Sequence, residues 1–460
     1  MSPQPTTARD VAVHALRDRA GNVTAHLERL LDEGRLESAD RSLAMELTFG
    51  TLRRKGTLAA LLAAFLKSPG RKLPGPVGEI LLVGAYQLVY CERIPDFAAV
   101  NEAVEQAVRF GHKRQSGLVN GVLRNLARDL GEATDQPEPL AEDVVLLSGR
   151  RGRRVDRAVF ANPQQRPAEY LAAAFSLPDE LARRWLEQFG SVHKAAEVAA
   201  ASNGRPPMIA RVNSLHADLD TVTAQLRLSG CPTTLHSNGR SLVLHETADI
   251  TALAAFAQGL FQPQDPTATE VVEALDPRPG EAILDFCAAP GTKTGHIGEK
   301  MQNRGQITAL DVTDGKCQLI SDNCHRLGVH IVEAMLADRA STLQPQSYDR
   351  ALVDAPCSNT GVLARRPEAR WRFSQQRLGE LAGDQKQLAA LAAQLVRPGG
   401  RLVYSTCSIE PEENQQVAQW LHENPNVPLK LEEQKLTLPH GADDPASWHD
   451  GGYRAIFTVR

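Results

Sequence analysis

From Thr267 onward, the chain alternates short apolar segments with longer segments whose apolar residues recur at helical spacing. Strands joined by helical crossovers become parallel neighbours in one sheet, with helices on both faces. The pattern predicts a doubly wound, Rossmann-like α/β domain over 259–460. We expect its strands at Ala282–Phe286, Gln306–Asp311, Val332–Leu336, Arg350–Asp354 and Arg401–Ser405, and an antiparallel edge hairpin from 428–436 and 453–459. We expect its helices at Thr294–Met301, Lys316–Leu327, Leu378–Val396 and Glu413–Glu423.

Residues 1–130 show helical spacing alone, which predicts an all-α bundle. Prolines 69, 74, 76 and 95 fall between the apolar segments, where they end helices without breaking them. We expect helices at Val11–Leu31, Leu43–Leu52, Leu58–Leu66, Val77–Tyr90, Val100–Phe110 and Gly117–Leu126.

Two regions separate the bundle from the α/β domain. Residues 131–165 are first acidic and proline-bearing, then arginine-rich at Gly149–Arg157, which predicts a linker or insertion open to disorder. Residues 166–258 predict a small α+β subdomain that begins with a short helical stretch. Its β-α-β-β order resembles RNA-recognition folds, although the aromatic stacking signature of those folds is missing. The elements expected there are Met208–Asn213, Leu219–Leu228, Thr233–His236 and Ser241–His245.

Composition limits the class of protein. A chain of 460 residues is too long for one compact core, and 42% hydrophobic with 23% charged residues is typical of soluble globular proteins. The longest apolar stretch, Ile80–Cys91, is too short for a membrane span, and no signal pattern opens the chain. Seven irregularly spaced cysteines do not form a disulfide framework, so we expect a cytoplasmic protein.

The net charge of −4 is unevenly distributed. Residues 1–130 carry 18 lysines and arginines against 14 aspartates and glutamates, whereas the remainder carries 33 against 41. The basic end is a candidate RNA surface, with random scatter of surface charge as the equally simple alternative. A second basic strip surrounds Trp371 and is typical either of RNA contact or of a packed tryptophan with solvated arginines. The strip consists of Arg365, Arg366, Arg370 and Arg372.

A turn with a single glycine follows the first strand of the expected α/β domain. In doubly wound sheets, ligands bind beyond the carboxyl ends of the strands. Gly291 lets the backbone approach a ligand closely, and Pro290 fixes the turn. The lone glycine argues against a dinucleotide fingerprint, and Phe286 stands where a P-loop needs its first glycine. The candidate ligand-binding residues of the turn are Cys287, Ala288, Ala289, Pro290, Gly291, Thr292 and Lys293.

Aspartates stand at the ends of three further strands. Asp311 comes about 20 residues after the turn, where a carboxylate takes both hydroxyls of a ribose. Asp338 is placed to contact an adenine amino group, and Asp354 ends the fourth strand. A single aspartate at a strand end could equally well be a residue that caps the following helix. Three at successive strand ends favour a nucleotide-type pocket.

Cys357 follows the fourth expected strand and Cys407 follows the fifth, so both thiols open on the same edge of the sheet as that pocket. An isolated cysteine is usually an inert core residue, but two beside one pocket suggest that one thiol attacks a pyrimidine ring and the other helps to undo the adduct. No C-x-x-C or Cys/His pair has zinc-ligand spacing, so we expect no metal site.

The segments CAAPGTKT (287–294), DAPCSNTG (354–361) and STCSIEPEEN (405–414) resemble the motifs of RNA 5-methylcytosine methyltransferases. Four N-terminal segments resemble NusB: 47–58, 84–95, 99–107 and 117–125. The combination resembles the RsmB (Sun or Fmu) family of bacterial ribosomal RNA cytosine-5 methyltransferases. The resemblance covers nearly the whole chain apart from 131–165. The chain departs from the family at Thr292, in APGTK for the usual APGGK, and in HDGGYRAIF for a DGFF-like sequence.

The resemblance implies that S-adenosylmethionine is the cofactor and that ribosomal RNA is the partner and substrate of the enzyme. No obligate protein partner is evident in the sequence, so we expect a monomer. It assigns Cys407 as the nucleophile that adds to carbon-6 of cytosine, and Cys357 as the thiol that assists release. Asp354 is expected to hydrogen-bond the base edge, and Lys293 to contact the base or a phosphate. Together with the turn, Asp311, Asp338 and Asp354 are expected to hold the cofactor.

Two other functions remain open from the sequence. The same chemistry on transfer RNA is one, although the NusB-like domain favours ribosomal RNA. The other is a non-catalytic RNA-binding or antitermination-type factor, but the presence of both cysteines, Lys293 and all three aspartates argues against a degraded site. DNA methylation is less consistent with a second thiol in a TCS motif.

Overall fold

The computed structural model describes residues 7–460 except 19–21, 35, 69–72, 137–139, 246–248 and 442. The chain divides into two compact units, each built from two stretches of sequence. The helical unit comprises Met1–Gly204 and Leu363–Ser374, and the sheet unit comprises Arg205–Val362 and Gln375–Arg460. Within the described residues, no helix combines the length and apolar character needed to cross a bilayer.

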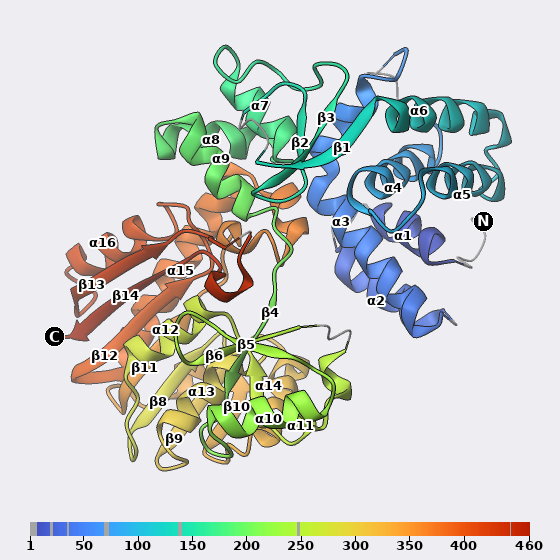
Figure 1. Cartoon of the computed structure of the whole chain (residues 1–460). Helices are drawn as coiled ribbons and strands as arrows, with labels where there is room; N and C mark the ends of the chain where they lie inside the picture. Colours follow the sequence, from blue (N-terminus) through green and yellow to red (C-terminus); the bar gives the residue numbers. More distant parts are fainter. Residues whose placement is uncertain are drawn as a thin grey trace. The chain divides into compact units, whose positions relative to one another are not determined.

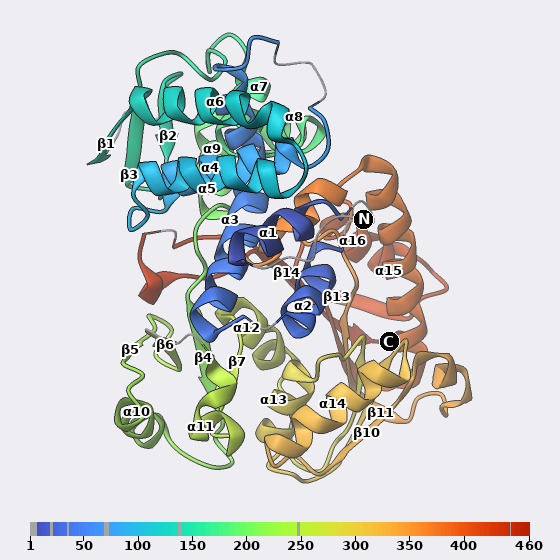
Figure 2. The same cartoon turned by 90° about the vertical axis from the view of Figure 1, so that its right-hand side faces the viewer.

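The first part of the helical unit is the predicted bundle (Figures 1 and 2). The prediction of two helices between 43 and 66 was wrong, because one long helix, α3, covers most of that stretch. Gly56 lies inside it, and its amide donates to Ser176 Oγ at 2.7 Å, so the glycine marks a close helix contact rather than a break. The helices of the bundle are α1 (Ala8–Leu16), α2 (Val23–Glu33), α3 (Ser38–Ala63), α4 (Val77–Tyr90), α5 (Asp96–Arg109) and α6 (Ser116–Asp129).

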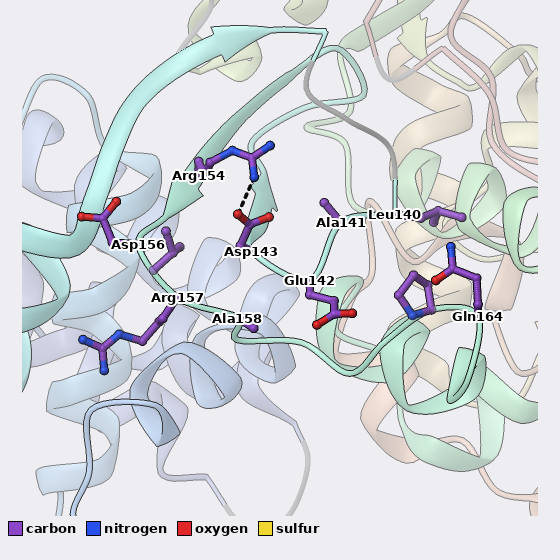
Figure 3. A pocket seen from close by; sticks show the side chains of 11 residues that line it. Leu140, Ala141, Glu142, Asp143, Arg154, Asp156, Arg157, Ala158 and Gln164 are labelled. Carbon is purple, nitrogen blue, oxygen red and sulfur yellow. Dashed lines mark hydrogen bonds and ion pairs between the residues drawn. The ribbon is translucent and has the colours of Figure 1, made fainter.

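The segment 131–165 contains a small antiparallel sheet instead of the predicted unstructured linker. Its strands β1 (Leu130–Asp135), β3 (Arg151–Val155) and β2 (Val144–Leu146) pair in that order. Val145 and Val155 are buried, while Arg154 forms an ion pair with Asp143, as Figure 3 shows. The arginine run therefore contains a strand, and ion pairs join its Arg151 to Glu92 and its Arg154 to Asp143. Short strands with mixed charges are hard to predict from the sequence.

The helices α7 (Pro167–Ala174), α8 (Asp179–Phe189) and α9 (Val192–Ala201) belong to the helical unit. They bury Tyr170, Leu181 and Trp185, and α7 packs against α3. The predicted α+β subdomain of 166–258 therefore extends across the division between the two units, which falls between Gly204 and Arg205.

The second stretch of the helical unit, Leu363–Ser374, contains the arginines and tryptophan predicted as an RNA strip. Arg370 is fully buried and donates to the main-chain oxygens of Arg53, Ser176 and Ser202. Trp371 Nε1 donates to Leu52 O at 3.0 Å. For these two residues the RNA prediction was wrong, because they fasten the segment to α3 and to the chain after α7 and α9.

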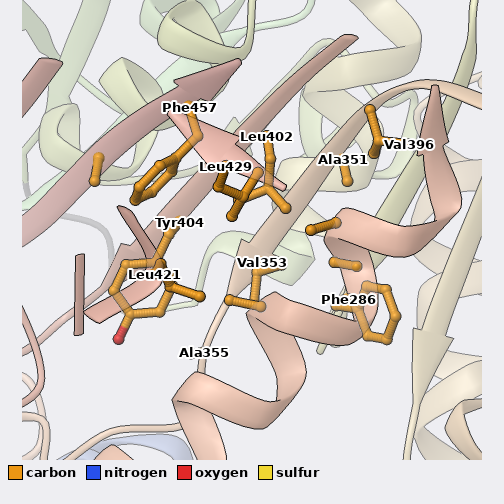
Figure 4. Close-up of a cluster of buried hydrophobic side chains, with 14 of the residues drawn as sticks. Phe286, Ala351, Val353, Ala355, Val396, Leu402, Tyr404, Leu421, Leu429 and Phe457 are labelled. Carbon is orange, nitrogen blue, oxygen red and sulfur yellow. The ribbon is translucent and has the colours of Figure 1, made fainter. Parts of the chain in front are cut away.

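The sheet unit contains a seven-stranded sheet in the order β10-β9-β8-β11-β12-β14-β13. The first five strands are parallel, and β14 pairs antiparallel with β12 and β13, which confirms the doubly wound domain and its edge hairpin. Figure 4 shows part of the core against which α15 packs, with Val353, Tyr404 and Phe457 from neighbouring strands. The strands are β8 (Ala282–Phe286), β9 (Gln306–Asp311), β10 (Val332–Leu336), β11 (Tyr348–Asp354), β12 (Val396–Thr406), β13 (Leu429–Thr437) and β14 (Gly452–Val459). The helices are α12 (Pro266–Leu275), α13 (Thr292–Lys300), α14 (Asp314–Arg326), α15 (Gln375–Leu395) and α16 (Gln415–Glu423).

A four-stranded antiparallel sheet completes this unit in the order β5-β6-β4-β7. The predicted β-α-β-β order is confirmed, and β7 is a fourth strand that the sequence pattern did not predict because it is only three residues long. The elements are β4 (Met208–Val212), α10 (Leu219–Leu228), β5 (Thr233–Leu235), β6 (Ser241–Leu244), α11 (Ala254–Ala257) and β7 (Phe261–Pro263).

Candidate active site

The turn between β8 and α13 lies at the carboxyl end of the central strand. Gly291 has φ +92°, which favours glycine, and a Cβ there would lie 3.1 Å from Ile320 Cα. Thr292 opens α13, and its Oγ1 accepts a hydrogen bond from Gln262 Nε2 at 3.5 Å. The side chain that replaces the family's second glycine thus contacts β7.

Two aspartates fix this turn from within. Asp285 is fully buried at the end of β8 and accepts from Thr294 Oγ1 at 2.7 Å, and burial raises its pKa to about 7. Asp311 at the end of β9 accepts from the amide of Ala289 at 2.9 Å and from Lys316 Nζ at 2.9 Å. Burial alone would raise the pKa of Asp311, but these bonds outweigh it and hold that pKa below its usual value.

Asp338 stands apart from the other predicted site residues. It lies exposed on the 3₁₀ helix η3 (Ala337–Thr342), directly after β10. In the described part of the chain, no hydrogen bond or ion pair joins its carboxylate to the turn or to the cysteines. Its assignment to the adenine amino group stays a prediction.

An ion pair between Lys293 and Asp354 joins the turn to the end of β11. Lys293 Nζ lies 2.5 Å from Asp354 Oδ2, and Asp354 Oδ1 accepts from Ser405 Oγ at 2.7 Å. Burial lowers the pKa of Lys293, but the charge and hydrogen bond of Asp354, and the nearby Cys407, outweigh it and raise that pKa. The lysine is therefore a fixed cation beside the Cys407 thiol.

The two predicted cysteines meet at the ends of the adjacent strands β11 and β12. Cys357 Sγ and Cys407 Sγ are 3.1 Å apart, and Cys407 is the more exposed of the two. The hydrogen bond with Cys407, together with burial, raises the pKa of Cys357, so this thiol keeps its proton. The geometry fits an arrangement in which Cys407 reacts and Cys357 stays neutral.

Asn359 connects the two cysteine motifs, and the sequence prediction missed it. Its Oδ1 lies 3.2 Å from Cys407 Sγ, and its Nδ2 donates to Cys357 O at 2.7 Å. The residue has φ +62°, a conformation that asparagine tolerates better than most other residues. The only sign in the sequence is its place two residues after Cys357.

Glu413 anchors the Cys357 loop from the buried side and was also missed. Its carboxylate accepts from the Ser358 amide at 2.8 Å and Ser358 Oγ at 2.5 Å, and from Gln385 Nε2 at 3.1 Å. Burial raises the pKa of Glu413. Glu413, which belongs to the third motif (405–414), thus positions the Cys357 loop of the second motif (354–361).

Near the C-terminus, the glycine that this chain shares with the family's DGFF-like sequence, Gly451, makes a close backbone contact. Gly451 N donates to Gly361 O at 2.8 Å, and a Cβ on Gly451 would lie 2.9 Å from Gly361 Cα. The Gly451–Gly452 pair therefore lets the chain before β14 pass directly over the Cys357 loop.

The residues present fit S-adenosylmethionine. A turn that a Cβ would fill lies at the central strand, with carboxylates at the ends of β8, β9 and β11. The candidate holders are the backbone of Cys287–Thr292 with Lys293, Asp311, Asp338 and Asp354. The described residues contain no group of three or more histidine, cysteine, aspartate or glutamate side chains placed to hold a metal ion.

Comparisons with known proteins place this chain in a family. The family model for 16S rRNA methyltransferase RsmB/F matches 272–444, the NusB family model matches 6–128, and the ferredoxin-like domain of RsmF/B-like methyltransferases matches 177–251. The ribosomal RNA small subunit methyltransferase B of Klebsiella pneumoniae is 36% identical over 86% of this chain and 84% of its own length. The probable ribosomal RNA small subunit methyltransferase B of Bacillus subtilis is 32% identical over 94% of this chain and 91% of its own.

A solved structure shares much of the fold. The methyltransferase homolog protein from Pyrococcus horikoshii is 26% identical, with a TM-score of 0.53, and the match covers 63% of this chain and 98% of that one. The fold and site thus define an S-adenosylmethionine-dependent methyltransferase with a Rossmann-like sheet. More particularly, the chain belongs to the RsmB/F family of RNA methyltransferases. The predicted family, fold class and cofactor are confirmed.

Proposed function

We propose that this enzyme methylates carbon-5 of a cytosine in small-subunit ribosomal RNA, with S-adenosylmethionine as donor and a covalent cysteine adduct as intermediate. Family membership supports the reaction and the ribosomal RNA substrate. The observation that carries the adduct is the pair of thiols 3.1 Å apart at the ends of β11 and β12.

Cys407 is the proposed nucleophile. Its thiolate forms a bond to carbon-6 of cytosine, and the electrons of the C5–C6 double bond move toward carbon-5, which becomes nucleophilic. The cofactor, when bound, supplies the electrophilic methyl group that carbon-5 takes. Before the attack, the Cys407 S–H donates to Asn359 Oδ1 at 3.2 Å, which orients the Sγ.

Cys357 is proposed to assist release after methylation. Carbon-5 must then lose its proton to solvent water so that the C5–C6 double bond re-forms. The bond from Cys407 to carbon-6 breaks with its electron pair on the Cys407 sulfur, and the neutral Cys357 thiol would donate its S–H to that leaving sulfur. Cys357 Sγ lies within 3.1 Å of the sulfur of that bond. Its raised pKa leaves it neutral during the attack, so it does not compete as a nucleophile.

Asp354 and Lys293 are proposed to contact the base. The Asp354 carboxylate is positioned by Lys293 and Ser405, and it would hydrogen-bond the cytosine edge. The cytosine must leave its stack to reach these groups, so a single-stranded loop or an unfolded rRNA intermediate is the proposed target. We propose that the enzyme acts as a monomer in the cytoplasm, because one chain supplies the whole site and its thiols need a reducing compartment.

The test is transfer of labelled methyl groups to unmodified small-subunit rRNA by wild type, Cys407→Ser and Cys357→Ser. We expect no transfer by Cys407→Ser and a denaturation-resistant RNA adduct with Cys357→Ser. Accumulation of adduct in Cys407→Ser would mean that Cys357 is the nucleophile and that Cys407 assists release. Transfer by wild type to tRNA but not to rRNA would contradict the proposed substrate and keep the chemistry.

A further inference from the structure

A hollow of about 1070 Å³ lies in the helical unit between the end of α3, the residues before α4, and α6. Its lining combines apolar side chains, including Phe65 and Leu118, with the cations Lys67 and Arg114. Leu118 is 38% exposed, a high fraction for a leucine on a packed helix. The hollow lies in the unit that does not contain the catalytic cysteines.

The charge of this hollow is of one sign. Its described lining contains Lys67 and Arg114 and no carboxylate, and neither cation forms an ion pair within the described residues. By contrast, the hollow of Figure 3 is lined by Glu142, Asp143 and Asp156 together with its arginines. Cations without local counter-charges attract a polyanion.

One wall of the hollow is bare helix backbone. Gly117 and Gly121 stand four residues apart on α6, so they share one face of it. A Cβ on either would meet no atom of the described chain within 4 Å. An interior helical glycine such as Gly121 costs about 1 kcal/mol relative to alanine, and no contact within the described chain requires it. The open wall is therefore available to something outside the chain.

We propose that this hollow binds a single-stranded stretch of the ribosomal RNA substrate, an inference that rests on the proposed function. Lys67 and Arg114 take phosphates, and a base lies on the glycine face of α6 against Leu118. Gln115 and Asn125, which also line the hollow, offer both donors and acceptors to a base edge. Phe65 is held in place because the Arg157 guanidinium lies 4.4 Å from its ring centroid.

The test compares variants of the full-length enzyme in two assays. The first is binding of unmodified small-subunit rRNA and of a labelled single-stranded oligonucleotide of about ten residues. The second is kcat and KM for methyl transfer to the rRNA. The hollow variants are Gly121→Leu, which fills the wall, and Lys67→Gln with Arg114→Gln, which removes the charge.

We expect Gly121→Leu to raise Kd and KM at least roughly fivefold, as for loss of one base contact, with kcat unchanged. Its melting temperature should not fall, because leucine favours a helix more than glycine does. The double charge variant should bind more weakly and reduce the slope of log Kd against log salt by about 1.4.

Matched controls separate binding from folding. Gly383→Leu makes the same change on α15, where a Cβ also meets nothing within 4 Å. Arg124→Gln removes an exposed charge of α6 that does not line the hollow. If wild type methylates rRNA and the hollow variants bind it as tightly as wild type does, the inference about the hollow is overturned and the proposed function stands. Failure of wild type to methylate rRNA would overturn the proposed function. The binding assays would then still show whether the hollow binds single-stranded RNA.

Discussion

At the scale of single residues, the site depends on groups that hold the cysteines as much as on the cysteines themselves. The two thiols and the Lys293–Asp354 pair could be named from the motifs, because each stands directly after an apolar strand or in the turn. Asn359 and Glu413 could not, because their roles arise from contacts between segments about 50 residues apart. A polar residue after a cysteine gives no sign of which side chain it faces.

Asn359→Gly should lower kcat for methyl transfer roughly fivefold, because it removes the acceptor that orients Cys407 Sγ, a contact of about 1 kcal/mol. Glycine also accepts the positive φ, so the unfolding free energy should change little. Single-turnover rates and denaturant unfolding would be measured together, with Asn359→Asp restoring an acceptor. A Gly variant with the wild-type rate would show that the contact is only structural.

Asp285 should make stability depend on pH. Its pKa is about 7 in the folded protein and near 3.8 otherwise, so the folded state binds the proton more tightly. Stability is therefore highest at acidic pH and falls as pH rises from about 4 through 7, by up to about 4 kcal/mol. Asp285→Asn should remove this part of the pH dependence, as denaturant unfolding at pH 5 and pH 8 would reveal. Asp338→Asn, at an exposed position, is the control, and an unchanged profile for Asp285→Asn would contradict the expectation.

At the scale of elements, three of the seven strands of the α/β domain, β8, β9 and β10, could be predicted to the residue, because each is a short apolar run. The other four were predicted in place, but their bounds differ by one to five residues. The small sheet at 130–155 could not, since its strands are short and carry charges that become paired only after folding. The continuity of α3 was missed for a related reason. Gly56 interrupts the apolar pattern without ending the helix. A glycine stands at this position because Ser176 approaches the helix closely there.

Gly56→Ala should destabilise the helical unit although alanine favours helices. A Cβ there would lie 2.9 Å from Ser176 Cα, and such overpacking typically costs about 1–3 kcal/mol. Gly379→Ala on α15 is the matched control, because its Cβ has open space and should add up to about 1 kcal/mol. Thermal unfolding of the two variants should shift in opposite directions. A higher melting temperature for Gly56→Ala would contradict the close contact.

At the scale of the whole molecule, the sequence predicted domains in linear order, whereas the chain enters the helical unit twice. The second entry, Leu363–Ser374, could not be predicted, because buried and exposed arginines look alike in a sequence. Arg370 differs from its neighbours only in what surrounds it. Burial, and then the nearby Arg53 and Arg54, lower its pKa well below the usual value.

Arg370→Met should destabilise the enzyme strongly, by about 3 kcal/mol or more, because several buried carbonyls lose their donor. Arg372→Met is the control, since that side chain is 53% exposed. Denaturant unfolding of both variants would be compared with wild type. A loss of similar size in both would contradict the structural role of Arg370.

Because the helical unit consists of two separate stretches of sequence, the protein cannot be divided into its two units by one cut in the chain. A fragment that ends at Gly204 would present α3 without Leu363–Ser374. A fragment that begins at Arg205 would carry that segment with Arg370 deprived of the carbonyls of the first stretch. No single break in the gene separates the two units cleanly. A chimera that takes either unit from a relative would therefore have to keep Arg370 matched to the carbonyls that it binds.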